Sequence, residues 1–407
     1  MRKSTSIIHS GAALLVAFLT ACSTSGRFTV EAGDYDREDC LVRMPVKKDT
    51  KHCSLVETTN GQKTPVACQV VEEGDSCWLY FTMAGSTSAG SVRTYRYTGT
   101  RPTAEGHRMG VEDNGKSLTL TSGGKSIMTY NYTLSEVPQG VRKVYERSGY
   151  IHPACTPSGF VYTNIQPVDH RHHYGIWNPW TRVEYDNQTY DLWNLGDSLG
   201  TVRADKIEET YQGEVLTGFN AKLKHIIFSP EGEKAIMDEE WQIKAVENGN
   251  GYLWDFVSIL EPCAENPVTI KAYRYQGFSC RATDVWTREN CRMRTSEGLE
   301  RPEIDATTAR WIYVNGNVDN QESGFMFMSY PDNYNTPEPL RIWNQDSNGG
   351  RGDVYVNFCP TKTADWKLEP GRKYVLRYRV YAYDGEMSDK QAERLWTDFA
   401  HPPTIKK

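Results

Sequence analysis

The stretch "DEEWQIKAVENGNGYLWDFVSIL", residues 238–260, has the pattern of a β-hairpin. Apolar and polar side chains alternate on both sides of "ENGNG" at 247–251, a segment with the composition of a tight turn. Such alternation turns one side of each strand toward a core. Similar short alternating runs recur along the chain with turn residues between them, so the sequence predicts an all-β protein.

The runs form two groups separated by the polar segment 101–116, which contains glycine and proline. We therefore expect a small N-terminal β domain, a sandwich or barrel, over residues 27–113. Residues 114–401 are expected to form a larger antiparallel β-sandwich, for which a galactose-mutarotase-like supersandwich is one form. Helical spacing is clear in "SDKQAERLWTDFA" at 388–400, which predicts a short C-terminal helix.

The N-terminal segment has the composition of an export signal. It combines a cationic start, an apolar run that ends near Leu19 and small residues before Cys22. The "LTAC" sequence that ends at Cys22 resembles a bacterial lipobox, which implies a lipoprotein signal peptide over 1–22 and lipidation of Cys22. Ser23 then favours the outer membrane, on the cell surface or the periplasmic face. A plain signal peptide cleaved near Cys22 is the alternative.

The charge balance is mildly acidic. Lys and Arg number 46 and Asp and Glu 52, a net charge of −6, and removal of Arg2 and Lys3 with the signal would make it −8. This balance argues against a nucleic-acid partner. The 24 tyrosines and 11 tryptophans suit an all-β protein with aromatic-lined grooves.

Cysteine usage fits an oxidising compartment. Apart from Cys22 there are nine cysteines, and the short gaps from Cys68 to Cys77 and from Cys280 to Cys291 suit disulfide-bridged hairpins. No two cysteines have CxxC spacing, which argues against a zinc ribbon or a thioredoxin-type site.

A cluster of histidines is the main candidate for chemistry. The stretch "HPACTPSGFVYTNIQPVDHRHHYGIWNPW", residues 152–180, contains four of the nine histidines. In one interpretation, His172 or His173 is a general acid or base oriented by Asp169. In a second, three of the histidines bind a divalent metal ion, and in a third they only satisfy backbone groups of a long loop. The metal-ligand candidates are His152, His170 and His172.

Aromatic residues follow the histidines. The segment "YGIWNPWTRVEYDNQTYDLWNLGD", residues 174–197, interleaves rings with Arg, Asp and Asn. Flat rings suit the apolar faces of sugars, and the polar groups can bind hydroxyls or a uronic carboxylate, although each ring could instead pack in the core. The "RGD" tripeptide at 351–353 is assigned no function. The candidate substrate-binding residues are His170, Trp177, Trp180, Arg182, Asp191, Trp193, Arg281, Trp343 and Asn344.

The motifs from His152 onward resemble those of the bacterial family labelled "methane oxygenase PmoA-like". The matching segments are "HPACTPSGFV", "DHRHHYGIW" and "DLW", and the resemblance covers residues 118–399. Asn194 follows Trp193 where that family commonly has a histidine. The resemblance implies a β-sandwich body and a bacterial carbohydrate-utilisation setting.

These features together predict a lipid-anchored, carbohydrate-active enzyme that cleaves a glycosidic bond in a polysaccharide or oligosaccharide. In β-elimination next to a uronic acid, a base would remove the α-proton while Arg182 or a metal neutralises the enolate. In hydrolysis, two carboxylates about 5 to 9.5 Å apart would act together. The candidate catalytic residues are His152, Asp169, His172, His173 and Tyr174, and the carboxylates considered for hydrolysis are Asp169, Asp191, Asp197, Glu239 and Glu240.

Two alternatives from other classes stay open. One is a non-catalytic glycan-binding lipoprotein, and the other is a metal-dependent oxygenase or other redox enzyme.

Overall fold

The computed structural model describes residues 25–48, 50, 53–99 and 108–407. The predicted signal peptide with Cys22 lies outside the described residues, as does part of the predicted domain boundary, residues 101–107. Within the described ranges the elements are β-strands, two short 3-10 helices and one α-helix, which confirms the predicted all-β class. In the same ranges no helix has the length and apolarity to span a bilayer.

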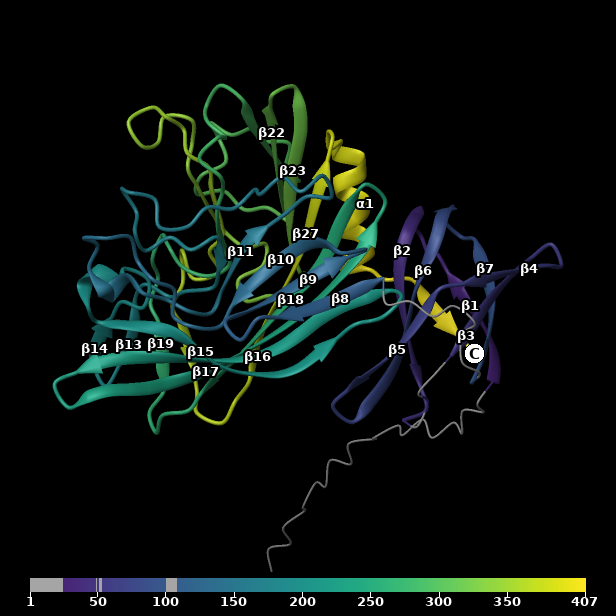
Figure 1. Cartoon of the computed structure of the whole chain (residues 1–407), viewed down its shortest axis with the longest axis horizontal. Helices are drawn as coiled ribbons and strands as arrows, with labels where there is room; N and C mark the ends of the chain where they lie inside the picture. The colour runs from purple at the N-terminus through teal and green to yellow at the C-terminus, as the bar shows by residue number, and fades with distance from the viewer. Residues whose placement is uncertain (1–24, 49, 51–52, 100–107) are drawn as a thin grey trace, which may run out of the picture.

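A small β-sandwich forms the N-terminal part and lies on the right of Figure 1. One sheet contains, in order, β2 (Arg37–Val46), β6 (Ser76–Thr87) and β5 (Cys68–Glu73). The other contains, in order, β28 (Thr404–Lys406), β1 (Ser25–Glu31), β7 (Val92–Thr98), β3 (Ser54–Thr59) and β4 (Gln62–Val66). Phe28, Phe81 and Tyr95 pack in the core between the two sheets.

Two eight-stranded sheets form the larger β-sandwich. The first contains, in order, β24 (Leu340–Ile342), β25 (Tyr355–Phe358), β20 (Ser279–Arg281), β12 (Ile176–Trp177), β11 (Tyr150–Ala154), β10 (Lys125–Asn131), β9 (Ser117–Ser122) and β8 (Met109–Asp113). The second contains, in order, β15 (Gly200–Tyr211), β16 (Leu216–Ser229), β17 (Gly232–Asn248), β18 (Gly251–Pro262), β27 (Tyr374–Asp384), β23 (Gln321–Ser329), β22 (Trp311–Val318) and β21 (Cys291–Thr295). A large apolar core with Trp241, Phe256 and Phe278 near its middle fills the space between them.

Shorter elements complete the larger unit. A four-stranded sheet contains, in order, β14 (Gln188–Tyr190), β13 (Val183–Tyr185), β19 (Val268–Ile270) and β26 (Trp366–Leu368). The 3-10 helices are η1 (Lys143–Tyr145) and η2 (Leu195–Asp197).

The predicted C-terminal helix is confirmed as α1 (Asp389–Ala400). The Ser388 side chain caps it by accepting a hydrogen bond from the Gln391 amide at 3.2 Å. One face of the helix is buried in an apolar cluster that also contains residues of β5, β6, β22, β23 and β27, so α1 packs where the two sandwiches meet. The buried apolar residues of that face are Ala392, Leu395, Trp396 and Phe399.

The predicted disulfide bridges are wrong, because none of the nine cysteines in the described residues takes part in a disulfide. Strand register separates the first pair, since Cys68 lies opposite Phe81 and not opposite Cys77. The second pair lies in different sheets, with Cys280 in β20 and Cys291 in β21.

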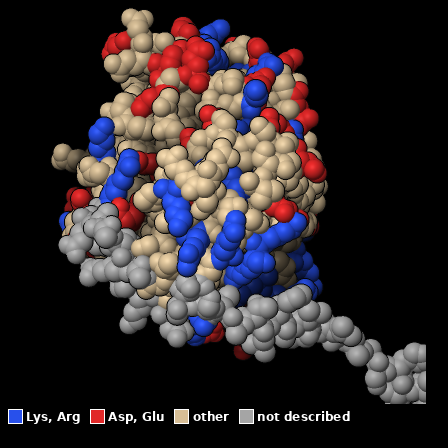
Figure 2. Space-filling view, turned by 90° about the vertical axis from the view of Figure 1, so that its right-hand side faces the viewer, with Lys and Arg blue, Asp and Glu red and all other residues tan. Residues whose placement is uncertain are grey.

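Positive side chains gather on the small sandwich. Figure 2 shows Lys and Arg concentrated in the lower part of that side of the molecule, while Asp and Glu are denser at the top. Arg27 of β1 lies directly opposite Arg96 of β7, and both side chains are exposed. The mildly acidic chain therefore carries its positive charge unevenly.

Candidate functional site

The histidine-bearing loop lies on the outer face of the first eight-stranded sheet. It connects β11 and β12, where Ile151 and Ile176 pair and face the large core. Because side chains alternate along a strand, Tyr150 and Trp177 lie on the opposite face, in a separate buried cluster. This cluster consists of Tyr150, Tyr174, Trp177, Trp193, Leu195, Trp343 and Tyr355.

Two turns fold the loop so that three imidazoles meet. The His170 amide donates to the Pro167 carbonyl and the His173 amide donates to the His170 carbonyl, both at 3.0 Å. The Gln166 amide closes the loop by donating to the His173 carbonyl at 2.8 Å. The ring centroids of His170 and His173 are 4.8 Å apart, and those of His172 and His173 are 4.7 Å apart. His173 is buried, whereas His170 and His172 are half-buried.

Aromatic rings form the floor beneath the imidazoles. The ring centroid of His170 is 4.8 Å from that of Trp343, and that of His173 is 5.4 Å from that of Trp177. His173 also stacks on Tyr355, with centroids 5.4 Å apart. The three aromatic residues are at most 5% exposed, so they support the histidines and offer little ring surface to a ligand.

Charged side chains border the imidazoles. Arg281 is buried, and its guanidinium lies 2.7 Å from the Asp353 carboxylate. Arg351, which is half exposed, donates to the same carboxylate at 2.5 Å and lies 3.4 Å from the Asp169 carboxylate. The Asp169 carboxylate is in turn 3.4 Å from Nδ1 of His170. A guanidinium and a carboxylate thus reach the surface beside the histidines.

Burial keeps the imidazoles neutral. Desolvation, followed by repulsion from charged neighbours that include Arg281, lowers the pKa of His172 to about 4. Desolvation also places the pKa of His173 well below its ordinary value. Burial alone would raise the pKa of Asp353, but hydrogen bonding from Arg351 and attraction by Arg281 lower it to about 2. Near neutral pH the site therefore combines uncharged imidazoles with an ionised carboxylate.

Two predicted catalytic residues lie apart from this group. His152 is hydrogen-bonded through Nδ1 to the Thr163 hydroxyl at 2.9 Å, and within the described residues no ring contact joins it to the other histidines of the motif. Tyr174 is buried, and its hydroxyl donates to the Tyr145 carbonyl. The Tyr174 hydroxyl therefore faces the protein interior and not a substrate at the surface.

Several predicted binding residues also lie elsewhere. Trp180 packs in the large core, and Arg182 is exposed with its guanidinium 4.3 Å from the ring centroid of Tyr273. Asp191 accepts two backbone amides, each at 2.8 Å, and Asn344 accepts one at 3.2 Å. Asp191 and Asn344 therefore shape local turns. The predicted residues that do meet at the site are Asp169, His170, His172, His173, Trp177, Trp193, Arg281 and Trp343.

The carboxylates considered for hydrolysis are dispersed. Glu239 is buried in the large sandwich, where it is 2.8 Å from His225. Glu240 follows it in β17 and points to the other face of that sheet, and Asp197 is exposed in η2. Among these carboxylates, Asp169 is the one that borders the imidazoles.

The arrangement gives no support to a metal centre. Among the described residues, no three His, Cys, Asp or Glu side chains are grouped as metal ligands would be. His152 is held by Thr163 and stands apart from His170 and His172, the other two predicted ligands.

Three residues of the site were missed by the sequence reasoning. Arg351 and Asp353 belong to the "RGD" tripeptide, and Asn348 donates its side-chain amide to both Asp353 and Asp169. Arg351 and Asp169 are 182 residues apart in the sequence, so spacing gave no sign that they meet. One feature of the sequence could have indicated these residues. Arg351 and Asp353 lie in one glycine-rich turn, 348–353, shortly after the predicted binding residues Trp343 and Asn344.

Comparisons with known proteins identify a family and a fold. A family model described as "Family of unknown function (DUF6807)" matches residues 117–397. The predicted resemblance to the "methane oxygenase PmoA-like" family is therefore wrong, because the matching model is that of a family of unknown function. No curated protein matches the chain.

Two solved structures from Enterococcus faecalis are similar. A protein in the glycosyl hydrolase family 38 matches with 7% identity and a TM-score of 0.51 over 95% of this chain and 48% of that one. An alpha-mannosidase matches with 9% identity and a TM-score of 0.45 over 95% of this chain and 46% of that one. The chain thus spans about half the length of these proteins. At such identity, the first match shows a shared β-rich fold and nothing further.

Proposed function

The chain belongs to a family of unknown function, DUF6807, and from this premise we propose that it is a carbohydrate-active enzyme that cleaves a glycosidic bond. The observation that carries the proposal is the half-buried, neutral imidazole of His172 in one cluster with Arg351 and Asp169. A neutral imidazole can accept a proton, and a guanidinium can bind the carboxylate of an acidic sugar. The shared β-rich fold of a glycosyl hydrolase family 38 protein shows that such a fold occurs in proteins of this class.

The charge states at the site favour elimination over hydrolysis. Hydrolysis by two carboxyl groups requires one of them to be protonated at working pH. At this site the pKa of Asp353 is lowered to about 2. The pKa of Asp169 is lowered as well, because hydrogen bonding from Asn348 and other attractions outweigh the effect of burial. Neither carboxyl group is suited to act as the acid, whereas His172 is neutral and free to accept a proton.

In the proposed elimination, His172 removes the proton next to the carboxylate of a uronic acid. The electron pair of that C–H bond forms a C=C double bond, and the bond between the adjacent carbon and the glycosidic oxygen breaks. The departing oxygen takes up a proton from water. Arg351 binds the uronate carboxylate and stabilises the negative charge that develops on it, a task that the sequence predicted for Arg182 or a metal.

The proposal is tested on the purified mature protein with a panel of polyuronates and neutral polysaccharides. We expect unsaturated products that absorb near 235 nm, as a C=C bond conjugated to a carboxylate does at roughly that wavelength. The rate should be constant through neutral pH and fall as the pH drops through about 4, because protonation removes the base.

The variant His172→Ala should lose about 10²- to 10⁴-fold in rate, the usual contribution of a general base. The variant His401→Ala is the matched control, because His401 is an exposed histidine stacked on Tyr35. Reducing ends without absorbance would indicate hydrolysis. Glycan binding without any product would replace the proposal with that of a non-catalytic binding protein.

We also infer that the protein is an outer-membrane lipoprotein anchored through Cys22. The lipobox-like "LTAC" supports this inference. Cells that express the full chain and are fed an alkyne-tagged fatty acid should yield labelled protein, and Cys22→Ser should abolish the label. Equal labelling of both proteins would show that Cys22 is not the site of attachment.

A further inference from the structure

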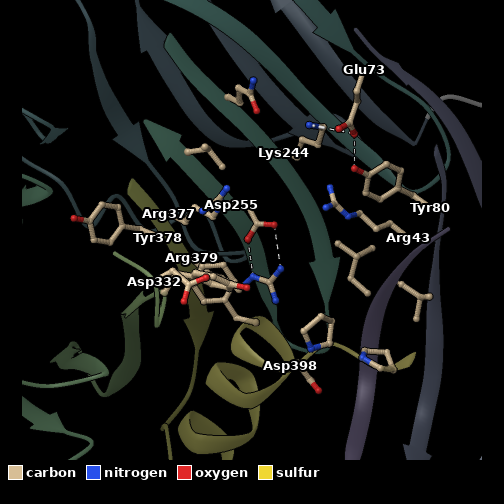
Figure 3. A pocket seen from close by; sticks show the side chains of 18 residues that line it. Arg43, Glu73, Tyr80, Lys244, Asp255, Asp332, Arg377, Tyr378, Arg379 and Asp398 are labelled. Atoms are coloured by element: carbon tan, nitrogen blue, oxygen red, sulfur yellow. Dashed lines mark hydrogen bonds and ion pairs between the residues drawn. The ribbon is translucent and has the colours of Figure 1, made fainter. Parts of the chain in front are cut away.

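A cavity of about 490 Å³ lies between the two sandwiches (Figure 3). Its floor is the outer face of β17, β18 and β27, and its walls come from β2, β5 and β6 of the small sandwich and from the end of α1. None of the residues that line it belongs to the site described above.

The first row of side chains across the floor is electrically balanced. Lys244, Asp255 and Arg379 are neighbours in strand register. The Asp255 carboxylate accepts two hydrogen bonds from Arg379, at 2.6 and 3.0 Å. Lys244 lies 3.3 Å from the Glu73 carboxylate in the wall. The charges of this row thus neutralise one another.

Two other guanidiniums at the cavity are not balanced. Gln242, Val257 and Arg377 are neighbours in strand register and form the next row of the floor. The guanidinium of Arg377 lies 5.6 Å from the ring centroid of Tyr330. On the small-sandwich side, Arg43 is exposed and its guanidinium lies 4.6 Å from the ring centroid of Trp78. In the described part of the chain neither Arg43 nor Arg377 has a carboxylate within ion-pair distance. Figure 3 shows these two side chains on opposite sides of the cavity.

The rest of the lining suits a sugar. Asp332 is exposed at the rim and is the one lining carboxylate without an ion pair among the described residues, so the unpaired charge of the cavity is net positive. Tyr330, Pro402 and Pro403 contribute flat apolar surface. Apolar ring faces stack on the C–H faces of sugars, and a guanidinium binds a carboxylate through two parallel hydrogen bonds.

We propose that this cavity is a second glycan-binding site, which takes an acidic oligosaccharide segment. Arg43 binds one uronate carboxylate from the wall, Arg377 binds another from the floor, and Tyr330 packs against a sugar face. The volume of about 490 Å³ lies within the range of about 300 to 1,000 Å³ that is usual for small-ligand sites. The choice of a uronate as ligand rests on the proposed function. The observation that two guanidiniums lack an ion-pair partner is independent of it.

The test measures binding of a galacturonate hexasaccharide by isothermal titration calorimetry. Every protein carries His172→Ala, so that the probe is not cleaved. Adding Arg43→Ala and Arg377→Ala together should weaken one class of site at least tenfold. Adding Arg96→Ala instead removes one exposed arginine from the outer face of the small sandwich and should leave binding unchanged. Tyr330→Ala should weaken the same class of site as the paired arginine variant.

Three results would overturn the inference. The first is equal binding by the paired arginine variant and the Arg96→Ala control, with thermal melting showing that both are folded. The second is binding of cellohexaose, a neutral chain of the same length, as tightly as the acidic probe. The third is no binding of the acidic probe at millimolar concentration. Failure of the proposed function appears separately, as absence of product from the wild-type protein while the cavity still binds the probe.

Discussion

The side chains of the histidine cluster acquire their charge states in two opposite ways. Burial removes water from His172 and His173, so their pKa values fall and the rings are neutral. Arg281 is also buried, which lowers its pKa, but the Asp353 carboxylate opposes this effect. The Arg281 guanidinium remains a cation 4.9 Å from the ring centroid of Trp343. A proton acceptor and fixed positive charge are therefore available at the same pH.

A buried carboxyl outside the site allows a direct test of how burial acts on charge. Glu338 accepts hydrogen bonds from Ser329 at 2.5 Å, Asn333 at 2.7 Å and Tyr378 at 2.9 Å. Burial nevertheless raises its pKa from 4.5 to about 7, although the hydrogen bonds act to lower it. Because the folded pKa is the higher one, the stability that this group contributes is fully present below pH 4.5 and lost as the pH rises through about 7.

We predict that Glu338→Gln stabilises the protein in alkaline solution alone. Its free energy of unfolding should exceed that of the wild type by about 1 to 3 kcal/mol at pH 8.5, and should equal or fall below it at pH 5. Urea denaturation at the two pH values measures the difference. Glu386→Gln alters an exposed carboxylate near Arg292 and should show no such pH dependence. A wild type that is more stable than Glu338→Gln at pH 8.5 would contradict the prediction.

At the scale of single elements, alternation of side chains was sufficient to predict the hairpin at 238–260. The hairpin at 238–260 is formed by β17 and β18, which meet at the pair Asn248 and Gly251. Trp241, Ile243 and Ala245 of β17 face the core, whereas Gln242 and Lys244 between them lie on the outer face. The helix α1 was equally predictable, because its apolar spacing and its Ser388 cap are local features of the sequence.

The pairing of strands that are distant in sequence could not be predicted. Strand β12 pairs with β11 on one side and with β20 on the other, and β20 then pairs with β25. This order brings Arg281 and the turn at 348–353 to the histidines. No local pattern encodes such an order, because it depends on how the sheets pack. Trp180 was expected at the site as a sequence neighbour of the histidines, but it lies beyond the end of β12 and packs in the core.

At the scale of the whole molecule, polar contacts join the two sandwiches. The guanidinium of Arg37 in β2 lies 2.8 Å from the carboxylate of Asp398 in α1, and both side chains are buried. The Gln69 side chain of β5 accepts the amides of Val215 and Leu216 at 3.0 and 2.9 Å. Removing one partner of a buried pair leaves an uncompensated charge, so such contacts hold two units in a defined arrangement. The wall and the floor of the second cavity are thereby kept opposite each other.

The two ends of the described chain lie in one sheet. Strand β28 pairs with β1, with Thr404 opposite Glu31 and Lys406 opposite Thr29. Lys406 also lies 2.7 Å from the Glu31 carboxylate, although such an exposed pair contributes little to stability. The backbone pairing is the larger effect, because without β28 the strand β1 would be an open edge of the sheet.

We therefore predict that deletion of residues 403–407 loosens β1 while the larger sandwich stays intact. Amide hydrogens of β1 that β28 protects should exchange at least tenfold faster, which corresponds to about 1.4 kcal/mol of lost local stability. Amides of β17, in the middle of the second eight-stranded sheet, should exchange as before. Hydrogen-exchange mass spectrometry of the intact and shortened proteins measures both strands.

Lys406→Ala keeps the backbone of β28 and should leave exchange in β1 nearly unchanged. Equal protection of β1 in the shortened protein would mean that β28 does not close this edge, whereas faster exchange in β17 as well would mean that the two sandwiches unfold as one unit.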